Sequence, residues 1–144
     1  MAFLRSRSTK VELLRKVPLF KGLSQRQLEQ VAKLVDEYEA PAGKRLAASG
    51  ETGRELFIIV SGQARVSVPR GRTARLGPGE FFGEMSLVDG GPRSASVEAE
   101  TPMQLLVVGR REFWALLDEA PSLSATIMRT LATRLRAAEG AATA

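Results

Sequence analysis

Between residues 43 and 109, turn-forming residues recur too closely for a long helix. Gly, Pro or Ser interrupts this interval every eight to twelve residues, and short apolar segments lie between the interruptions. That spacing is typical of all-β structure. We therefore expect short strands in six segments: residues 45–48, 56–60, 64–68, 73–76, 95–100 and 104–108.

Many short strands joined by glycine-bearing turns favour a barrel or a double-sheet jelly roll. A closed roll also protects its strand edges from pairing with other chains. Pro69-Arg70-Gly71-Arg72 is expected to form a hairpin turn. Its arginines, with Arg75, are interpreted as a solvated turn rather than a nucleic-acid patch, because no aromatic residues alternate with them.

Helical patterns flank this β region on both sides. Toward the N-terminus, apolar residues recur at helical spacing after Ser24, which forms a capping-box pattern with Gln27. Pro41 and Gly43 are expected to end this helical region. Toward the C-terminus, two apolar stripes predict further helices: Phe113, Leu116 and Leu117, then Leu123, Ile127, Leu131 and Leu135. Gly140 is expected to end the last helix, and Trp114 is expected in the core.

The chain has no cysteine and no histidine. These absences remove disulfides, thiolate metal sites, most other metal sites, and every Ser/His or Cys/His arrangement for hydrolysis. The commonest general base is missing as well. We therefore expect a binding module without a metal or cofactor, not an enzyme.

The formal net charge of +5 suggests an affinity for anions, although a surplus of this size is also common on ordinary surfaces. The longest apolar run, residues 56–60, is far shorter than the roughly 20 residues of a membrane-spanning helix. Residues 1–10 are basic and are not followed by a hydrophobic signal core. We expect a cytoplasmic protein with a solvated N-terminal tail.

Residues 76–97 combine glycine-rich turns with one arginine, three carboxylates and hydroxyl groups. A short helical turn beginning near Gly83 would present free N–H groups, which are well suited to a phosphate. Arg93 offers a planar fork that matches two phosphate oxygens, and Ser94 adds a hydroxyl. Glu84 would repel phosphate unless it faces a neutral donor such as a sugar hydroxyl. Together these residues predict a site for a phosphate joined to a sugar.

The string FFGEMSLVDGGPRSASV resembles the phosphate-binding cassette of cyclic nucleotide-binding domains. These are the regulatory modules of cyclic AMP-dependent kinases, nucleotide-gated channels and bacterial catabolite-type regulators, and the pattern is closest to bacterial channels. VPLFKGLSQRQLEQVAKLV is similar to the family's N-terminal helical segment, and GKRLAASGETGRELFIIVSGQARV to its early strands. The resemblance covers about residues 13–138.

The resemblance implies a mainly β jelly roll, or double-stranded β-helix, with an N-terminal helical segment and two C-terminal helices. Residues 11–140 would form the domain, and residues 1–10 and 141–144 would be tails.

The resemblance also implies a role for each site residue. Glu84 would accept from the ribose 2′-hydroxyl, and Arg93 would pair with the cyclic phosphate. Gly83, Met85 and Ser86 would add backbone contacts beside Glu84. Ser94 and the Ala95 amide would complete the contacts to the phosphate. Val68 and Ala74 are candidates for contact with the base. The residue of the last helix that covers the base stays open among Ile127, Arg129 and Arg134.

We expect a sensor that binds cyclic AMP or cyclic GMP and relays occupancy through its C-terminal helices to an effector protein or domain. In the family, a Thr after the cassette arginine often accompanies cyclic GMP. Ser94 can serve either nucleotide, which leaves a slight preference for cyclic AMP. The alternative is a basic nucleic-acid-associated regulator. With about four residues after Gly140, we expect no helix-turn-helix and no sequence-specific DNA binding. A catalytic metal-binding jelly roll would need histidines.

Overall fold

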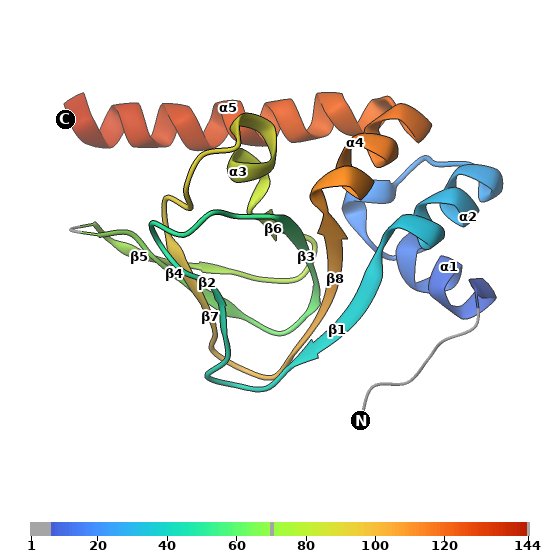
Figure 1. Ribbon diagram of the computed structural model, residues 1–144, viewed down its shortest axis with the longest axis horizontal. Helices are drawn as coiled ribbons and strands as arrows, with labels where there is room; N and C mark the ends of the chain where they lie inside the picture. Colours follow the sequence, from blue (N-terminus) through green and yellow to red (C-terminus); the bar gives the residue numbers. More distant parts are fainter. Residues whose placement is uncertain (1–6, 70, 144) are drawn as a thin grey trace.

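The computed structural model describes the backbone of residues 7–69 and 71–143, and the side chains of residues 9–69, 71–84 and 86–137. Helical elements precede, interrupt and follow a roll of strands (Figure 1). The helical elements are α1 (Arg7–Arg15), η1 (Pro18–Phe20), α2 (Gln25–Leu34), α3 (Glu84–Asp89), α4 (Arg110–Glu119) and α5 (Ser122–Thr143). The strands are β1 (Asp36–Ala40), β2 (Arg45–Ala47), β3 (Glu55–Ser61), β4 (Ala64–Ser67), β5 (Thr73–Leu76), β6 (Phe81–Phe82), β7 (Ser96–Ala99) and β8 (Met103–Gly109).

The strands form two antiparallel four-stranded sheets, in the orders β1-β8-β3-β6 and β2-β7-β4-β5. Apart from β4 and β5, which form a hairpin within one sheet, successive strands alternate between the two sheets, as in a jelly roll. The predicted class, mainly β with flanking helices, is therefore confirmed. The described helices extend past the expected domain limits of residues 11 and 140.

All six expected strands are present, but two further strands were not predicted. β1 carries the sequence DEYEA, and only its last residue, Ala40, is buried. β1 lies at the edge of its sheet, where it pairs with β8 on one side and its charged side chains remain in solvent. β6 has only two residues and no readable periodicity. The helical region accordingly ends at Leu34, before the stop expected at Pro41.

The predicted hairpin joins β4 to β5, with Ser67 opposite Thr73. The amide of Gly71 donates to the carbonyl of Val68 at 2.9 Å and closes the turn. Arg70 lies outside the described residues.

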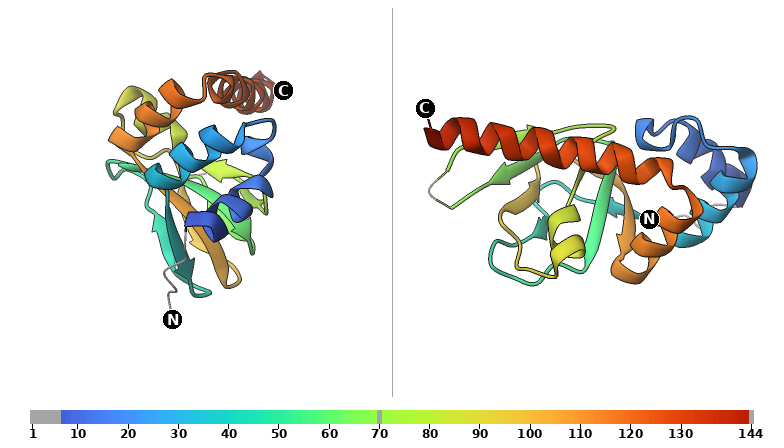
Figure 2. Two further views of the ribbon diagram at one scale, coloured as in Figure 1. Left: turned by 90° about the vertical axis from the view of Figure 1, so that its right-hand side faces the viewer. Right: turned by 90° about the horizontal axis from the view of Figure 1, so that it is seen from above.

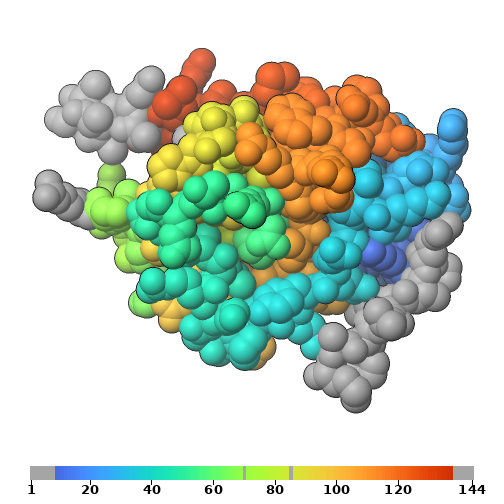
Figure 3. Space-filling view, in the orientation of Figure 1, coloured from blue at the N-terminus to red at the C-terminus, as the bar shows by residue number. Residues whose placement is uncertain are grey.

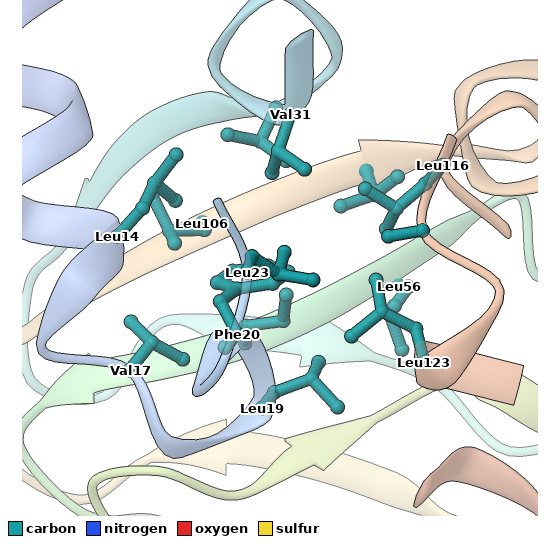
Figure 4. Close-up of a cluster of buried hydrophobic side chains, with 14 of the residues drawn as sticks. Leu14, Val17, Leu19, Phe20, Leu23, Val31, Leu56, Leu106, Leu116 and Leu123 are labelled. Atoms are coloured by element: carbon teal, nitrogen blue, oxygen red, sulfur yellow. The ribbon is translucent and has the colours of Figure 1, made fainter. Parts of the chain in front are cut away.

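β3 separates two apolar clusters because alternate side chains of a strand point to opposite faces. Leu56 and Ile58 pack against the helices, whereas Phe57 and Ile59 face the interior of the roll. Figure 4 shows the helical cluster, in which labelled side chains of α1, η1, α2, α4 and α5 converge on Leu56 and Leu106. In the roll, the Phe57 and Phe82 rings stack at 4.9 Å. The two clusters thus share one sheet as a common wall.

The predicted capping box is present at the start of α2. The Gln27 amide donates to Ser24 Oγ at 3.1 Å, and the Ser24 amide donates to Gln27 Oε1 at 2.9 Å. These two bonds satisfy donors that a helix start otherwise leaves unpaired.

α5 differs from its prediction in two respects. Leu123 and Ile127 are buried, but Leu135 is 60% exposed, because the helix runs beyond the helical cluster and along the top of the roll (Figures 1 and 2). Gly140 does not end the helix, which continues to Thr143. A glycine ends a helix when it turns the chain with a positive φ, and Gly140 is not among the positive-φ glycines.

The prediction for Trp114 was wrong. Its side chain is 46% exposed, whereas the adjacent Phe113 is fully buried and meets the indole edge-on at 5.4 Å. Neighbouring helical positions face directions about 100° apart, so only one of the two reaches the core. None of the helices formed by the described residues has the length and apolar character that crossing a bilayer requires.

Candidate functional site

α3 lies beside α5 above the roll and carries Glu84, Met85 and Ser86 of the cassette (Figures 1 and 2). Gly83 caps its N-terminus with φ of 95°, a left-handed conformation that side-chain-bearing residues rarely adopt. A Cβ there would also meet the Arg93 guanidinium and lie 2.6 Å from the carbonyl oxygen of Glu55. The expected helical turn near Gly83 is therefore present, and its glycine is required both by φ and by a close approach.

Arg93 is held by backbone and side-chain contacts with the segment that leads into β3. Its amide donates to the Glu51 carbonyl at 2.7 Å, and its carbonyl accepts from the Gly50 amide at 2.9 Å. The guanidinium Nη2 donates to the Glu55 carbonyl at 2.9 Å. In the space-filling view, the segment around residue 90 lies against residues 45–55, consistent with these bonds (Figure 3).

The Arg93 side chain is nearly buried, and its Nη1 has no hydrogen-bond partner among the described residues. Burial lowers the pKa of the Arg93 guanidinium, and the carboxylates of Glu55 and Glu84 oppose this effect. Arginine nevertheless stays charged in proteins. A buried cation with an unused donor is costly unless it is paired, so the site favours an incoming anion.

Glu84, the first residue of α3, is only 2% exposed, and its Oε1 accepts from Arg134 Nη1. Arg134 lies on α5 and also donates through Nη2 to the Phe81 carbonyl at 2.6 Å. Its guanidinium carbon lies 5.1 Å from the centre of the Phe81 ring, within the range of a cation–π contact. α5 is thereby tied to both β6 and α3.

Glu84, Arg93 and Arg134 border a cavity of about 450 Å³, a volume within the range of small-molecule sites. All of the predicted site residues except Met85 line it: Val68, Ala74, Gly83, Glu84, Ser86, Arg93, Ser94 and Ala95. Met85 is the second residue of α3, and its side chain lies outside the described residues. Val68 is 46% exposed and Ala74 is also exposed, so both lie near the opening.

The cavity has further lining residues that the sequence interpretation missed: Ala47, Val66, Leu76, Phe82 and Val97. Val66 lies on β4, two residues before Val68, which directly follows the strand, so period-2 alternation was a usable signal for it. Ala47, Phe82 and Val97 come from three other strands, and only the closed roll brings them together.

The structure distinguishes the three candidates from the last helix. Arg134 lines the cavity, Ile127 is buried in the helical cluster, and Arg129 is exposed beside a neighbouring hollow. Among the lining residues, Arg93 and Arg134 are cationic and Glu84 is anionic. The lining residues therefore carry one net positive formal charge together with several apolar side chains. This arrangement suits a monoanion with an apolar or aromatic portion.

Comparisons with known proteins agree with this geometry. The model of the cyclic nucleotide-binding domain family matches residues 37–120. The chain is 37% identical over 123 residues to a cyclic nucleotide-gated potassium channel of Rhizobium etli, covering 85% of this chain and 34% of the channel. It is 37% identical over 127 residues to the cyclic AMP receptor protein of Thermus thermophilus, covering 85% of this chain and 59% of that protein.

A solved structure supports the same assignment. The crystal structure of the Thermus thermophilus catabolite activator protein superimposes with a TM-score of 0.76 and 38% sequence identity, covering 85% of this chain and 60% of that one. The chain thus spans about a third of the channel and roughly three fifths of the receptor and activator proteins. On the matched residues, the roll and the cassette geometry, this chain belongs to the cyclic nucleotide-binding domain family.

Proposed function

We propose that this chain is a regulatory domain that binds cyclic AMP, in preference to cyclic GMP, in the cavity beneath α5. One observation carries the proposal: Arg93 lines the cavity with a buried Nη1 that has no partner among the described residues. Such a donor is satisfied by a phosphate oxygen. The net charge of the lining residues favours a cyclic phosphodiester, because the second charge of a linear monophosphate would be buried without compensation.

Each part of the nucleotide has a proposed place. The phosphate would pair with Arg93, assisted by the Ser94 hydroxyl and the Ala95 amide. The amides of Gly83, Met85 and Ser86 would face the sugar and phosphate, and Glu84 would accept from the 2′-hydroxyl. The base would lie against Val68 and Ala74. Support for these roles comes from the lining of one cavity by all of them except Met85, and from the match to the family's cassette.

Two observations support cyclic AMP as the preferred ligand. Position 94 is a Ser, whereas a Thr after the cassette arginine often accompanies cyclic GMP in the family. One of the relatives at 37% identity is named as a cyclic AMP receptor protein.

The proposed relay of occupancy runs through α4 and α5. α5 begins in the helical cluster, where Leu123 and Ile127 are buried, and reaches the cavity at Arg134. A ligand that strengthens or weakens the α5 contact therefore also biases the packing of α4. A coupling free energy of about 1–3 kcal/mol between ligand binding and the packing of α4 would suffice for this relay.

Calorimetric titration of the purified chain tests the proposal. We expect saturable binding of cyclic AMP, weaker binding of cyclic GMP, and much weaker binding of linear 5′-AMP. Arg93→Ala should cost about 2–5 kcal/mol, or roughly 30-fold to 4000-fold in affinity, because it leaves a buried phosphate unpaired.

Arg136→Ala is the matched control. Arg136 is an exposed residue of α5 that does not line the cavity, so its loss should leave the affinity unchanged. If Arg93→Ala binds as tightly as the wild type, the phosphate assignment is wrong. If the wild type takes up neither cyclic nucleotide at millimolar concentration, the proposed function is wrong.

A further inference from the structure

The outer face of α4 presents a tryptophan to solvent. Trp114 is 46% exposed and lies on one stripe with Arg111, Ala115 and Asp118, at positions i, i+3, i+4 and i+7 of a helix, all of them exposed. The opposite face of α4 is buried in the helical cluster, and α4 forms part of the surface drawn in orange in Figure 3. Tryptophan is enriched in protein–protein contacts, because covering its ring removes a large apolar area from water.

The charges of α4 are placed against its own helix dipole. Arg110 and Arg111 begin the helix, at the end that carries a partial positive charge, and Asp118 and Glu119 end it, where the partial charge is negative. Glu112 is the one acidic residue of the first turn. None of the four outer residues forms an ion pair with another residue of the described chain. The helix alone therefore does not explain this order of charges.

The same order of charges is self-complementary. When two identical helices pack antiparallel about a twofold axis, residues at equal distances on either side of the axis face each other. With the axis between Trp114 and Ala115, Arg111 faces Asp118 of the second copy, because both lie about 5 Å along the helix from the axis. The two outermost charged residues match in the same way. Each indole then meets a small alanine side chain.

α5 offers a second exposed apolar stripe, but its charges do not suit a second copy. Met128 and Leu135 are 62% and 60% exposed. The charged side chains in the described part of this helix are all arginines, at positions 129, 134 and 136. Pairing two such helices would bring like charges together, which is costly at an interface. α4 is therefore the helix whose charges favour pairing with itself.

We propose that a second copy of this chain docks on α4 in an antiparallel arrangement, with Trp114 packed on Ala115 and Arg111 paired with Asp118 of the other copy. The contact lies outside the cavity and needs no nucleotide, so it goes beyond the proposed function. One face of a helix of 10 residues buries little surface. The dissociation constant should therefore be on the order of 10–100 μM.

Sedimentation equilibrium of the purified chain, without nucleotide, tests the association, and tryptophan emission tests its location. Trp114 is the only tryptophan of the chain, so its emission should shift to shorter wavelength over the same concentration range in which dimers form. Trp114→Ala should raise the dissociation constant roughly tenfold or more. Leu135→Ala, at the exposed stripe of α5, is the matched control and should leave the dissociation constant within about twofold of the wild type.

Exchange of the charges tests the antiparallel register. Arg111→Asp and Asp118→Arg each place like charges opposite each other, so each variant alone should be monomeric where the wild type is dimeric. An equimolar mixture of the two variants should restore dimers, because opposite charges then meet at both contacts. Both substitutions agree with the helix dipole, and circular dichroism should show that α4 is retained. Arg136→Asp, on α5, should leave association unchanged.

The outcomes decide the proposal independently of nucleotide binding. If the wild type stays monomeric at about 1 mM with unchanged emission, the α4 contact is wrong. If Leu135→Ala loses the dimer and Trp114→Ala keeps it, the copies meet on α5 and the assignment is overturned. If the mixture of the two charge variants stays monomeric, the antiparallel register is wrong. Failure of cyclic nucleotide binding would overturn the proposed function and leave the α4 contact in place.

Discussion

At the scale of single residues, the pocket depends on the space left around the Arg93 guanidinium. Two glycines provide that space in different ways. Gly83 combines a positive φ with a close approach, whereas Gly53 is required by the close approach alone, since a Cβ there would collide with the guanidinium and lie 2.8 Å from Ser86 Cβ. Arg93 can therefore be displaced by a change that removes none of its own atoms.

Gly53→Ala is expected to weaken cyclic nucleotide binding by an order of magnitude or more. The added methyl group would push the guanidinium away from its place beside Glu55, and phosphate contacts depend steeply on geometry. Calorimetric titration with cyclic AMP, together with the unfolding midpoint, provides the measurement.

Gly43→Ala is the contrasting control. A Cβ at Gly43 meets nothing within 4 Å, but its φ of 87° makes any side chain strained. We expect a loss of about 1 kcal/mol in the free energy of unfolding with the affinity unchanged. Equal affinities for the Gly53 and Gly43 variants would contradict the steric argument.

At the scale of elements, the helices on the N-terminal side serve the site without touching it. α2 packs in the helical cluster with α4, and the Gln27 side chain also donates to the Glu119 carbonyl at 3.4 Å. The start of α2 is therefore connected to the end of α4, from which α5 departs. We expect changes here to alter the stability of the domain and not the chemistry of the cavity.

Ser24→Ala should lower the free energy of unfolding by about 1 kcal/mol, because it removes the hydroxyl that caps the Gln27 amide. Chemical denaturation monitored by far-UV circular dichroism measures this loss. Gln25→Ala, at the exposed first position of α2, should change stability by only a few tenths of a kcal/mol. A cyclic AMP affinity altered more than about threefold in the Ser24 variant would contradict the expectation that changes at α2 affect stability alone.

At the scale of the whole molecule, the two apolar clusters share the sheet that contains β3 and β8. The helical cluster packs on one face of this sheet through Leu56, Leu106 and Val108, and the roll interior uses the other face through Phe57 and Leu105. A disturbance of either cluster reaches the other through common strands. We therefore expect the described part of the chain to unfold as one cooperative unit.

Ligand should accordingly stabilise the entire domain. At a free cyclic AMP concentration of 100 times Kd, linkage predicts a gain of about 2.7 kcal/mol, or an increase in Tm on the order of 5–10 °C. A thermal melt with and without ligand measures the change. Arg93→Ala at the same ligand concentration should show little increase. A transition in which only part of the circular dichroism signal shifts would contradict the single unit.

Local patterns in the sequence were sufficient to predict the class of fold, most of the strands and the capping box. These features follow from local rules: turn residues at short intervals, alternation along strands, and a cap three residues before its partner. Glycines and one arginine in a fixed order were enough to indicate an anion site, because few backbone conformations and few side chains suit a phosphate.

Packing of the whole chain was needed to identify the strands that complete the cavity wall, the edge position that lets β1 carry charges, and the residue of α5 that meets the cassette. Arg134 and Glu84 are fifty positions apart. Their contact depends on how far α5 continues past the helical cluster, which no local pattern specifies. Periodicity assigns a residue to a face of its own element, but the contacts of that face are set by the packing of the entire chain.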